Sequence, residues 1–292
     1  MQAYGAVMKA SRTTEIDASG GAVPVLDDNN GERMVPASAG ADTFWEHVYR
    51  YAFATRFVMR KRVLDIACGE GYGAAALIQA GAAQVIGVDV SEMACAHARN
   101  KYGLDARLGN TDNIPLPGGS VDVVVSFETI EHVLEPGRFL DECFRVLAPG
   151  GRLVISTPNR KVHTDKLGVR NPHHCSELTE DEFASLLGAR FRDLRFNTQR
   201  PESVAWWSLR TLACESTPWK RVRGFARLRF AVQRRIFPEG VSEPTGEQRA
   251  TVSALIRRLA QSRRTLLNRY VVRPRRRFYR EESVYIIATA VR

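Results

Sequence analysis

Two glutamates and a histidine stand close together in Phe127–His132, whose sequence is FETIEH. The segment follows directly on Val121–Phe127, an apolar, β-branched run that predicts a buried strand. If a helix begins at Glu128, then Glu131 and His132 lie three and four residues further on and share one helix face with it. Two carboxylates and an imidazole on one face can relay a proton as a general base, or ligate a divalent metal ion.

A glycine-rich turn carries the second group of informative residues. The run Val63–Ile66 predicts a buried parallel strand, and after it come three glycines at alternate positions, Gly69, Gly71 and Gly73. Glycine lets the backbone turn tightly and approach a ligand closely, and the Ala-rich helix that follows offers unpaired N–H groups at its start. Asp89 ends the next predicted strand, where a carboxylate can accept hydrogen bonds from both ribose hydroxyls. The pattern predicts a nucleoside-type cofactor, although a strand-to-helix turn without a ligand is the alternative.

The elements that must position these residues alternate between strands and helices, which predicts an α/β fold with a doubly wound, mostly parallel sheet of seven strands. An Arg-rich helical insertion is expected before the last strand. Composition divides the chain into four segments. Residues 1–42 are expected to form a mobile N-terminal segment, and 43–200 the core. Residues 201–280 are expected to form the basic helical insertion, as a lid or substrate region over the cofactor mouth, and 281–292 the closing strand.

The charge and the cysteines limit which kind of protein this chain can be. The chain of 292 residues has a net charge of +10, but Trp219–Arg280 alone has eighteen Lys and Arg against three Glu. That segment therefore carries +15 and the rest −5, so the basic character belongs to one surface. No apolar stretch approaches the roughly 20 residues of a membrane span, and no signal peptide is expected at the N-terminus. Five scattered cysteines without a CxxC pair favour reduced thiols and a cytoplasmic protein.

Four segments together resemble a known enzyme family. They are DIACGEGYG around Gly69, LGNTDNIPL at Leu108–Leu116, VDVVVSF at Val121–Phe127 and RVLAPGGRLVIS at Arg145–Ser156. In this order and spacing the chain resembles the class I S-adenosylmethionine-dependent methyltransferases over about residues 63–159, and again from Ser283. The resemblance implies a Rossmann-like fold with an antiparallel last strand, and S-adenosyl-L-methionine as the cofactor.

The same resemblance implies which residues hold the cofactor. Asp65, Gly69 and Gly71 are expected at its amino-acid end and Asp89 at its ribose. Asn110 and Thr111 stand where the family usually has Asp-Ala beside the adenine, and Phe127 is expected near the methionyl part. The aromatic helix predicted at 44–58 is expected to cap the sheet; the alternative is that Arg33, Arg50 or Tyr51 approaches the cofactor carboxylate.

The E-x-x-E-H pattern resembles two metal-dependent groups, the ubiquinone-biosynthesis O-methyltransferases and the small-RNA 2′-O-methyltransferases. The second group adds a downstream histidine, and NPHHCSEL at Asn171–Leu178 supplies His173 and His174. This implies catalytic residues and a divalent metal site made of Glu128, Glu131, His132 and His174. The alternatives are proton transfer by His132 without a metal, and a purely structural role. The other histidines, His47, His97 and His163, show no such clustering and are expected at the surface or in the core.

The acceptor is the least determined part of the chemistry. The motifs GERMVP, HVYRYAF, SFETIEH and STPN resemble bacterial methyltransferases encoded with polysaccharide-biosynthesis machinery. This implies O-methylation of a hydroxyl on a sugar or glycan-related small molecule, including a phosphate-bearing one, because arginine forks bind phosphates. The same arginines suit contact with an anionic inner membrane surface. The rivals are an RNA 2′-O-methyltransferase with a divalent metal site, and a non-catalytic, cofactor-binding partner of glycosyltransferases.

Overall fold

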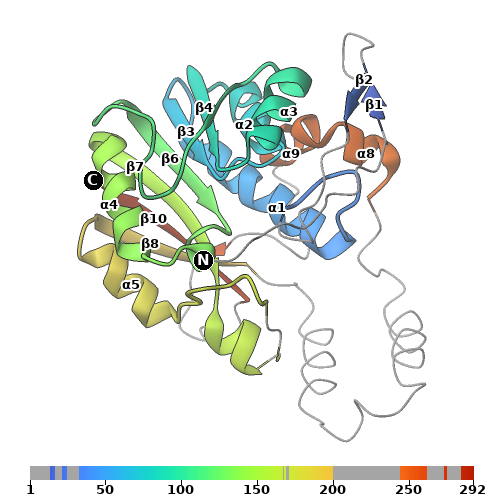
Figure 1. The fold of residues 1–292 in the computed structure, drawn as a ribbon. Coiled ribbons are helices and arrows are strands. Elements are labelled where there is room, and N and C mark those ends of the chain that lie inside the picture. The colour runs from blue at the N-terminus through green and yellow to red at the C-terminus, as the bar shows by residue number, and fades with distance from the viewer. Residues whose placement is uncertain are drawn as a thin grey trace, which may run out of the picture.

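The structure is a computed structural model, and it describes residues 14–16, 22–24, 33–166, 168, 171–199, 244–261, 273–274 and 284–292. One sheet of eight strands forms its centre, in the order β5-β4-β3-β6-β7-β10-β8-β9 (Figure 1). Its strands are β3 Arg62–Ile66, β4 Gln84–Asp89, β5 Asp105–Leu108, β6 Val121–Phe127, β7 Leu147–Pro158, β8 Arg192–Gln199, β9 Arg273–Pro274 and β10 Tyr285–Val291. Two further short strands, β1 Thr14–Ile16 and β2 Ala22–Pro24, pair antiparallel with each other.

The strand directions confirm the predicted fold class. The strands β5, β4, β3, β6 and β7 pair in parallel, and β10 lies antiparallel to both β7 and β8. The expected seven strands are therefore present, and the two-residue β9 extends the sheet at the β8 edge. Parallel strands end at the same edge of a sheet, so Asp89 at the end of β4 and Phe127 at the end of β6 lie along one edge.

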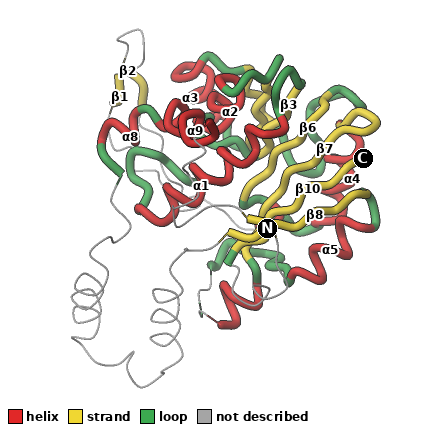
Figure 2. The backbone as a smooth tube through the Cα atoms, turned by 180° about the vertical axis from the view of Figure 1, so that it is seen from behind, coloured by secondary structure: helices red, strands yellow, loops and turns green. Residues whose placement is uncertain are grey.

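Helices cover both faces of the sheet (Figure 2). On one face α1, α2, α3 and α9 share an apolar core, and on the other face α4 and α5 share a second one. The helices are α1 Ala41–Ala54, α2 Tyr72–Gln79, α3 Glu92–Tyr102, α4 Pro136–Val146, α5 Glu180–Gly188, α8 Gly246–Ala250 and α9 Val252–Gln261. Two short 3-10 turns, η1 Thr55–Phe57 and η2 Ile130–His132, and one π-helix, η3 Lys161–Lys166, complete the set among the described residues. No helix among the described residues is long and apolar enough to cross a membrane.

Helix α1 caps the sheet, as predicted for the aromatic segment before the first core strand. Phe44, Val48 and Tyr51 are buried in the core on that face. The glycine-rich turn packs directly beneath this helix. A Cβ atom at Gly73 would lie 2.0 Å from Cζ of Tyr51, and one at Gly71 would lie 2.7 Å from Cβ of Ala98. Two of the three glycines are therefore required by the close packing of α2 against α1 and α3.

Substituting Gly73 with alanine is expected to destabilise the fold, because the added methyl group overlaps the ring of Tyr51. Overpacking of this kind costs about 1–3 kcal/mol of unfolding free energy. Three atoms of the buried Tyr51 ring would lie within 2.5 Å of the added Cβ, so the whole ring would have to move. Chemical denaturation measures the change. The matched control is Gly246→Ala at the start of α8, where nothing lies within 4 Å of the added Cβ and no loss is expected. An equal stability of the two variants would contradict this account of Gly73.

Two observations differ from the expected domain organisation. Residues 33–42 were expected to belong to a mobile segment, but Met34 and Val35 are buried. Arg249 of α8 donates hydrogen bonds to the carbonyl oxygens of Pro36 and Ala39 at 2.8 and 2.7 Å, which fixes this stretch. Within the insertion, the described residues 244–261 pack α9 on α1 and α2 rather than over the cofactor mouth, and the described residues 273–274 form β9 beside β8. Residues 201–243, 262–272 and 275–280 of the insertion lie outside the described residues.

Candidate active site

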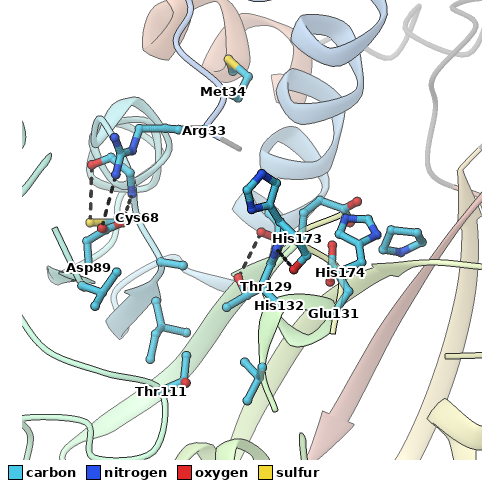
Figure 3. Close-up of a pocket in the computed structure, with 18 of the residues that line it drawn as sticks. Arg33, Met34, Cys68, Asp89, Thr111, Thr129, Glu131, His132, His173 and His174 are labelled. Carbon is cyan, nitrogen blue, oxygen red and sulfur yellow. Dashed lines mark hydrogen bonds and ion pairs between the residues drawn. The ribbon is translucent and has the colours of Figure 1, made fainter. Parts of the chain in front are cut away.

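A cavity of about 860 Å³ opens at the carboxyl ends of β3, β4 and β6. It lies at the edge where ligands bind in open α/β sheets. Two groups of predicted site residues line it, one around Gly69 and Asp89 and the other around Glu131, His132 and His174 (Figure 3). The volume is in the range of small-molecule and cofactor sites, so one cavity can hold a cofactor and the reacting part of an acceptor.

Asp89 is held in a fixed orientation at one end of the cavity. Its Oδ2 atom accepts a hydrogen bond from the Gly69 N–H at 2.8 Å, and its Oδ1 atom accepts one from the Ser91 N–H at 3.0 Å. The Arg33 guanidinium lies 3.8 Å from Oδ1, and the stem of this side chain passes over Gly69. Asp89 therefore presents a preorganised carboxylate next to the glycine turn, as a ribose site requires.

The segment after β6 has a different local structure from the predicted helix. Glu128 adopts a left-handed backbone conformation with φ +52°, and the short turn η2 begins at Ile130. The expectation that Glu128, Glu131 and His132 share one helix face is therefore wrong. Glu128 accepts a hydrogen bond from Ser156 Oγ at 2.6 Å, and its Oε1 atom lies 2.5 Å from Nη1 of Arg50.

Glu131, His132 and His174 come together at the other end of the cavity. One potential ligand atom from each of the three lies within 4.8 Å of the other two. The imidazole rings of His132 and His174 are 4.8 Å apart and nearly perpendicular. Among the described residues, neither carboxylate oxygen of Glu131 has a hydrogen bond of normal geometry, although the side chain is fully buried. Burial, and secondly the nearby Glu128 carboxylate, raises the pKa of Glu131 well above its usual value.

Backbone hydrogen bonds bring His174 to this position. The N–H groups of Cys175 and Ser176 donate to the carbonyl oxygen of Glu131 at 2.7 and 2.9 Å. The Ser176 Oγ atom lies 3.0 and 2.9 Å from the carbonyl oxygens of Ile130 and Val133, which share its single hydroxyl proton. The loop that contains His174 is thus fastened to the turn that contains Glu131 and His132. The three side chains form one cluster although His174 lies more than forty residues from Glu131 and His132 in sequence.

The comparisons with known proteins agree with this geometry. Residues 64–155 match the family model of a methyltransferase domain. Over 185 residues the chain is 40% identical to a protein of Mycobacterium tuberculosis named as a probable S-adenosylmethionine-dependent methyltransferase, and the match covers 62% of this chain and 67% of that protein. The chain belongs to the S-adenosylmethionine-dependent methyltransferases. A protein of the same name from Mycolicibacterium smegmatis is 42% identical over 57% of this chain and 65% of its own length.

More distant matches support the fold and one of the predicted resemblances. A ubiquinone biosynthesis O-methyltransferase of Parvibaculum lavamentivorans is 38% identical over 34% of this chain and 41% of its own length. The crystal structure of a Thermotoga maritima methyltransferase, named as a possible histamine N-methyltransferase, aligns with a TM-score of 0.52. At 17% identity over 86% of this chain and 92% of that one, it shows the shared fold. The chain matches about two thirds of the length of its mycobacterial relatives.

The methyltransferase places five of the seven predicted cofactor residues on the cavity wall. They are Gly69, Asp89, Asn110, Thr111 and Phe127. Asp65 and Gly71 do not line the cavity. Asp65 is buried beneath the loop and accepts a hydrogen bond from the Tyr51 hydroxyl, and burial raises the pKa of Asp65 to about 7. Both residues lie behind the glycine-rich turn, where Asp65 is hydrogen-bonded to Tyr51 and Gly71 packs on α3, and their part in cofactor binding stays a prediction.

Arg50 and Tyr51 line the cavity, and each is engaged by a carboxylate of the protein. The buried Arg50 guanidinium is paired with Glu128, lies 3.7 Å from Glu46 and stacks 4.4 Å from the ring centre of Tyr285. The Tyr51 hydroxyl donates a hydrogen bond to the Asp65 carboxylate, with a distance of 3.1 Å to Oδ2. Arg33 does reach the cavity, but its guanidinium lies beside Asp89, at the predicted ribose end. In the described structure these three side chains therefore fix the carboxylates of Asp89, Glu128 and Asp65.

Sequence reasoning missed two residues beside the histidine cluster. Glu177 Oε1 lies 2.6 Å from Nδ1 of His174 and 3.6 Å from Nδ1 of His163. Burial alone would raise the pKa of Glu177, but hydrogen bonds from Thr164 and His174 hold it below its usual value. The expectation that His163 stands outside any cluster is wrong, because η3 directs it back toward His174, with the ring centres 6.0 Å apart. The spacing of three residues between His174 and Glu177 was the one signal available in the sequence.

Proposed function

We propose that this methyltransferase transfers the methyl group of S-adenosylmethionine to a hydroxyl oxygen of a sugar or glycan-related small molecule. The observation that carries the proposal is the cluster of Glu131, His132 and His174 in the same cavity as Asp89. Methyl transfer from a sulfonium needs the acceptor atom in line with the methyl group, and a hydroxyl acceptor must lose its proton. A pair of imidazoles at the acceptor end supplies a base for that proton.

We further propose that this cluster binds a divalent cation. The fully buried Glu131 carboxylate, with no well-formed hydrogen bond in the described structure, is the kind of group that a cation would satisfy. Two imidazoles and one carboxylate suit borderline divalent ions. Glu131, His132 and His174 would hold the ion, and it would make the acceptor hydroxyl more acidic. Glu128, predicted as a further ligand, instead pairs with Arg50 and Ser156, so its part would be to fix Arg50 beside the cluster.

The acceptor class follows from the motifs and the charge of the sequence. A phosphate-bearing sugar suits the arginines of residues 201–280, and so does contact with the cytoplasmic face of a membrane. Arg257 and Arg258 of this segment are exposed on α9; Arg234 and Arg235 lie outside the described residues. An RNA 2′-hydroxyl is the competing acceptor, since the same +15 segment would attract a phosphate backbone. Membership of an enzyme family argues against the non-catalytic alternative.

One experiment tests acceptor and metal together. The full chain is incubated with methyl-labelled S-adenosylmethionine and either sugars, nucleotide-linked sugars or a short RNA, each with and without EDTA. We expect label in a sugar methyl ether, loss of transfer in EDTA, and recovery when a divalent ion is added in excess. Label in the RNA alone would replace the proposed acceptor by its competitor. Full activity in EDTA would eliminate the metal and leave His132 and His174 as the proton-transfer groups.

A further inference from the structure

The ring of His174 is held by a carboxylate as well as by its loop. Its Nδ1 atom lies 2.6 Å from Oε1 of Glu177, and the two side chains are only 9% and 10% exposed. This is the distance of a short, charge-assisted hydrogen bond. Two ligands of one tetrahedral ion, each about 2.1 Å from it, would lie about 3.4 Å apart. The geometry therefore indicates a shared proton between His174 and Glu177 rather than two ligands of one ion.

The Glu177 carboxylate is itself fixed from several sides. Its second oxygen, Oε2, accepts a hydrogen bond from the Thr164 hydroxyl. The Glu177 backbone carbonyl accepts one from Arg160 at 3.3 Å, and the His163 ring lies beside the carboxylate. Glu177 comes just before Thr179, whose capping box with Glu182 begins α5. The carboxylate is thus part of a rigid support, formed by η3 and the start of α5, behind the histidine cluster.

A histidine that donates its Nδ1 proton to a carboxylate carries a lone pair on Nε2. Both uses of His174 in the proposed function, as a base and as a metal ligand, require an unprotonated nitrogen facing the cluster. We propose that Glu177 is a positioning residue, which fixes the ring of His174 in the tautomer with the proton on Nδ1 and the lone pair on Nε2. This inference rests on the proposed function for the importance of His174, but the tautomer can be measured without any acceptor.

The first readout is the protonation of the His174 ring in the full-length protein, measured by nitrogen NMR and assigned with a His174→Gln variant. In the wild type we expect the proton on Nδ1. In Glu177→Ala we expect a shift toward Nε2–H, the tautomer that an unconstrained neutral histidine side chain prefers in water. Glu177→Gln should keep the wild-type tautomer, because its amide oxygen still accepts from Nδ1. A wild-type spectrum with the proton on Nε2, or an Ala variant with unchanged tautomer, would overturn the proposal.

The second readout is kinetic and uses the sugar that accepts label in the screen above. Loss of a carboxylate that orients a functional histidine lowers activity about 10- to 100-fold. For Glu177→Ala we expect this loss in kcat, with the affinity for S-adenosylmethionine unchanged and most activity restored in Glu177→Gln. The matched control is Asp181→Ala, four residues away, whose carboxylate is 66% exposed and lies 3.9 Å from Lys161. Its kcat should equal that of the wild type.

The two readouts separate this inference from the proposed function. If His174→Gln transfers methyl groups to hydroxyls at the wild-type rate, the proposed function of the cluster fails whatever Glu177 does. If His174→Gln is inactive while Glu177→Ala keeps full kcat, the positioning role of Glu177 fails and the cluster stands. If Glu177→Ala does not fold, the His174 tautomer in the wild-type spectrum and the kcat of Glu177→Gln still test the positioning role of Glu177. Equal losses of cofactor affinity and kcat in Glu177→Gln would assign Glu177 a structural role and also overturn the proposal.

Discussion

Replacing Asp89 with alanine is expected to lower the affinity for S-adenosylmethionine by roughly 100- to 1000-fold. The carboxylate is aimed at the cavity by the N–H groups of Gly69 and Ser91, and each oxygen has a second lone pair for a ribose hydroxyl. A hydrogen bond to a charged group contributes about 1.5–3 kcal/mol, so losing two of them costs about 3–4 kcal/mol or more. Isothermal titration calorimetry of the purified protein with the cofactor measures the effect.

Two further variants separate ribose binding from support of the loop. Asp89→Asn keeps one oxygen that can accept from a backbone N–H, so it should preserve the turn better than alanine while still binding cofactor weakly. Asp105→Ala removes a carboxylate at the start of the neighbouring strand β5, where it pairs with Arg107, and should leave the affinity unchanged. An unchanged affinity in Asp89→Ala would refute the assignment of Asp89 to the ribose.

The part of the fold that follows from local sequence was predicted well. Alternating apolar runs and helical segments determine a parallel sheet, and the end of each strand then places Asp89 and Phe127 at one edge. The purpose of individual glycines was not predictable in the same way. Gly73 is needed because the ring of Tyr51, from a helix more than twenty residues earlier, occupies the place that a Cβ atom would take. Such a contact depends on the packing of two helices and leaves no mark in the glycine spacing.

In the candidate site, too, the features set by local sequence were predicted and those set by tertiary contacts were not. His132 and Glu131 were identified from their types and spacing, but the left-handed conformation of Glu128 was not foreseen, because a regular helix was assumed there. That conformation ends the regular spacing on which the shared helix face depended. His174 is held in the cluster because the N–H groups of Cys175 and Ser176 donate hydrogen bonds to the carbonyl oxygen of Glu131. Contacts of this kind are tertiary, so resemblance to a family suggested His174 while spacing alone did not.

Replacing His132 or His174 with alanine is expected to lower kcat for methyl transfer to a hydroxyl by about 10²- to 10⁴-fold. The cluster lies at the opposite end of the cavity from Asp89, so the affinity for S-adenosylmethionine should stay within about twofold. Single-turnover transfer at saturating cofactor measures the chemical step directly. Cysteine at position 175 offers a matched control, because its side chain is exposed and Cys175→Ala keeps the backbone N–H that fastens the loop. That variant should retain the wild-type rate.

The double variant of His132 and His174 tests whether the two imidazoles act as one unit. Residues that serve a single proton transfer, or a single ion, are strongly non-additive, so the double variant should be little slower than the slower single variant. Rings 4.8 Å apart are close enough for this coupling. If the two losses multiply instead, the histidines act in separate steps, one on the acceptor proton and one on acceptor binding. Wild-type rates in both single variants would remove the two histidines from the reaction, because a group other than these imidazoles would then have to take the hydroxyl proton.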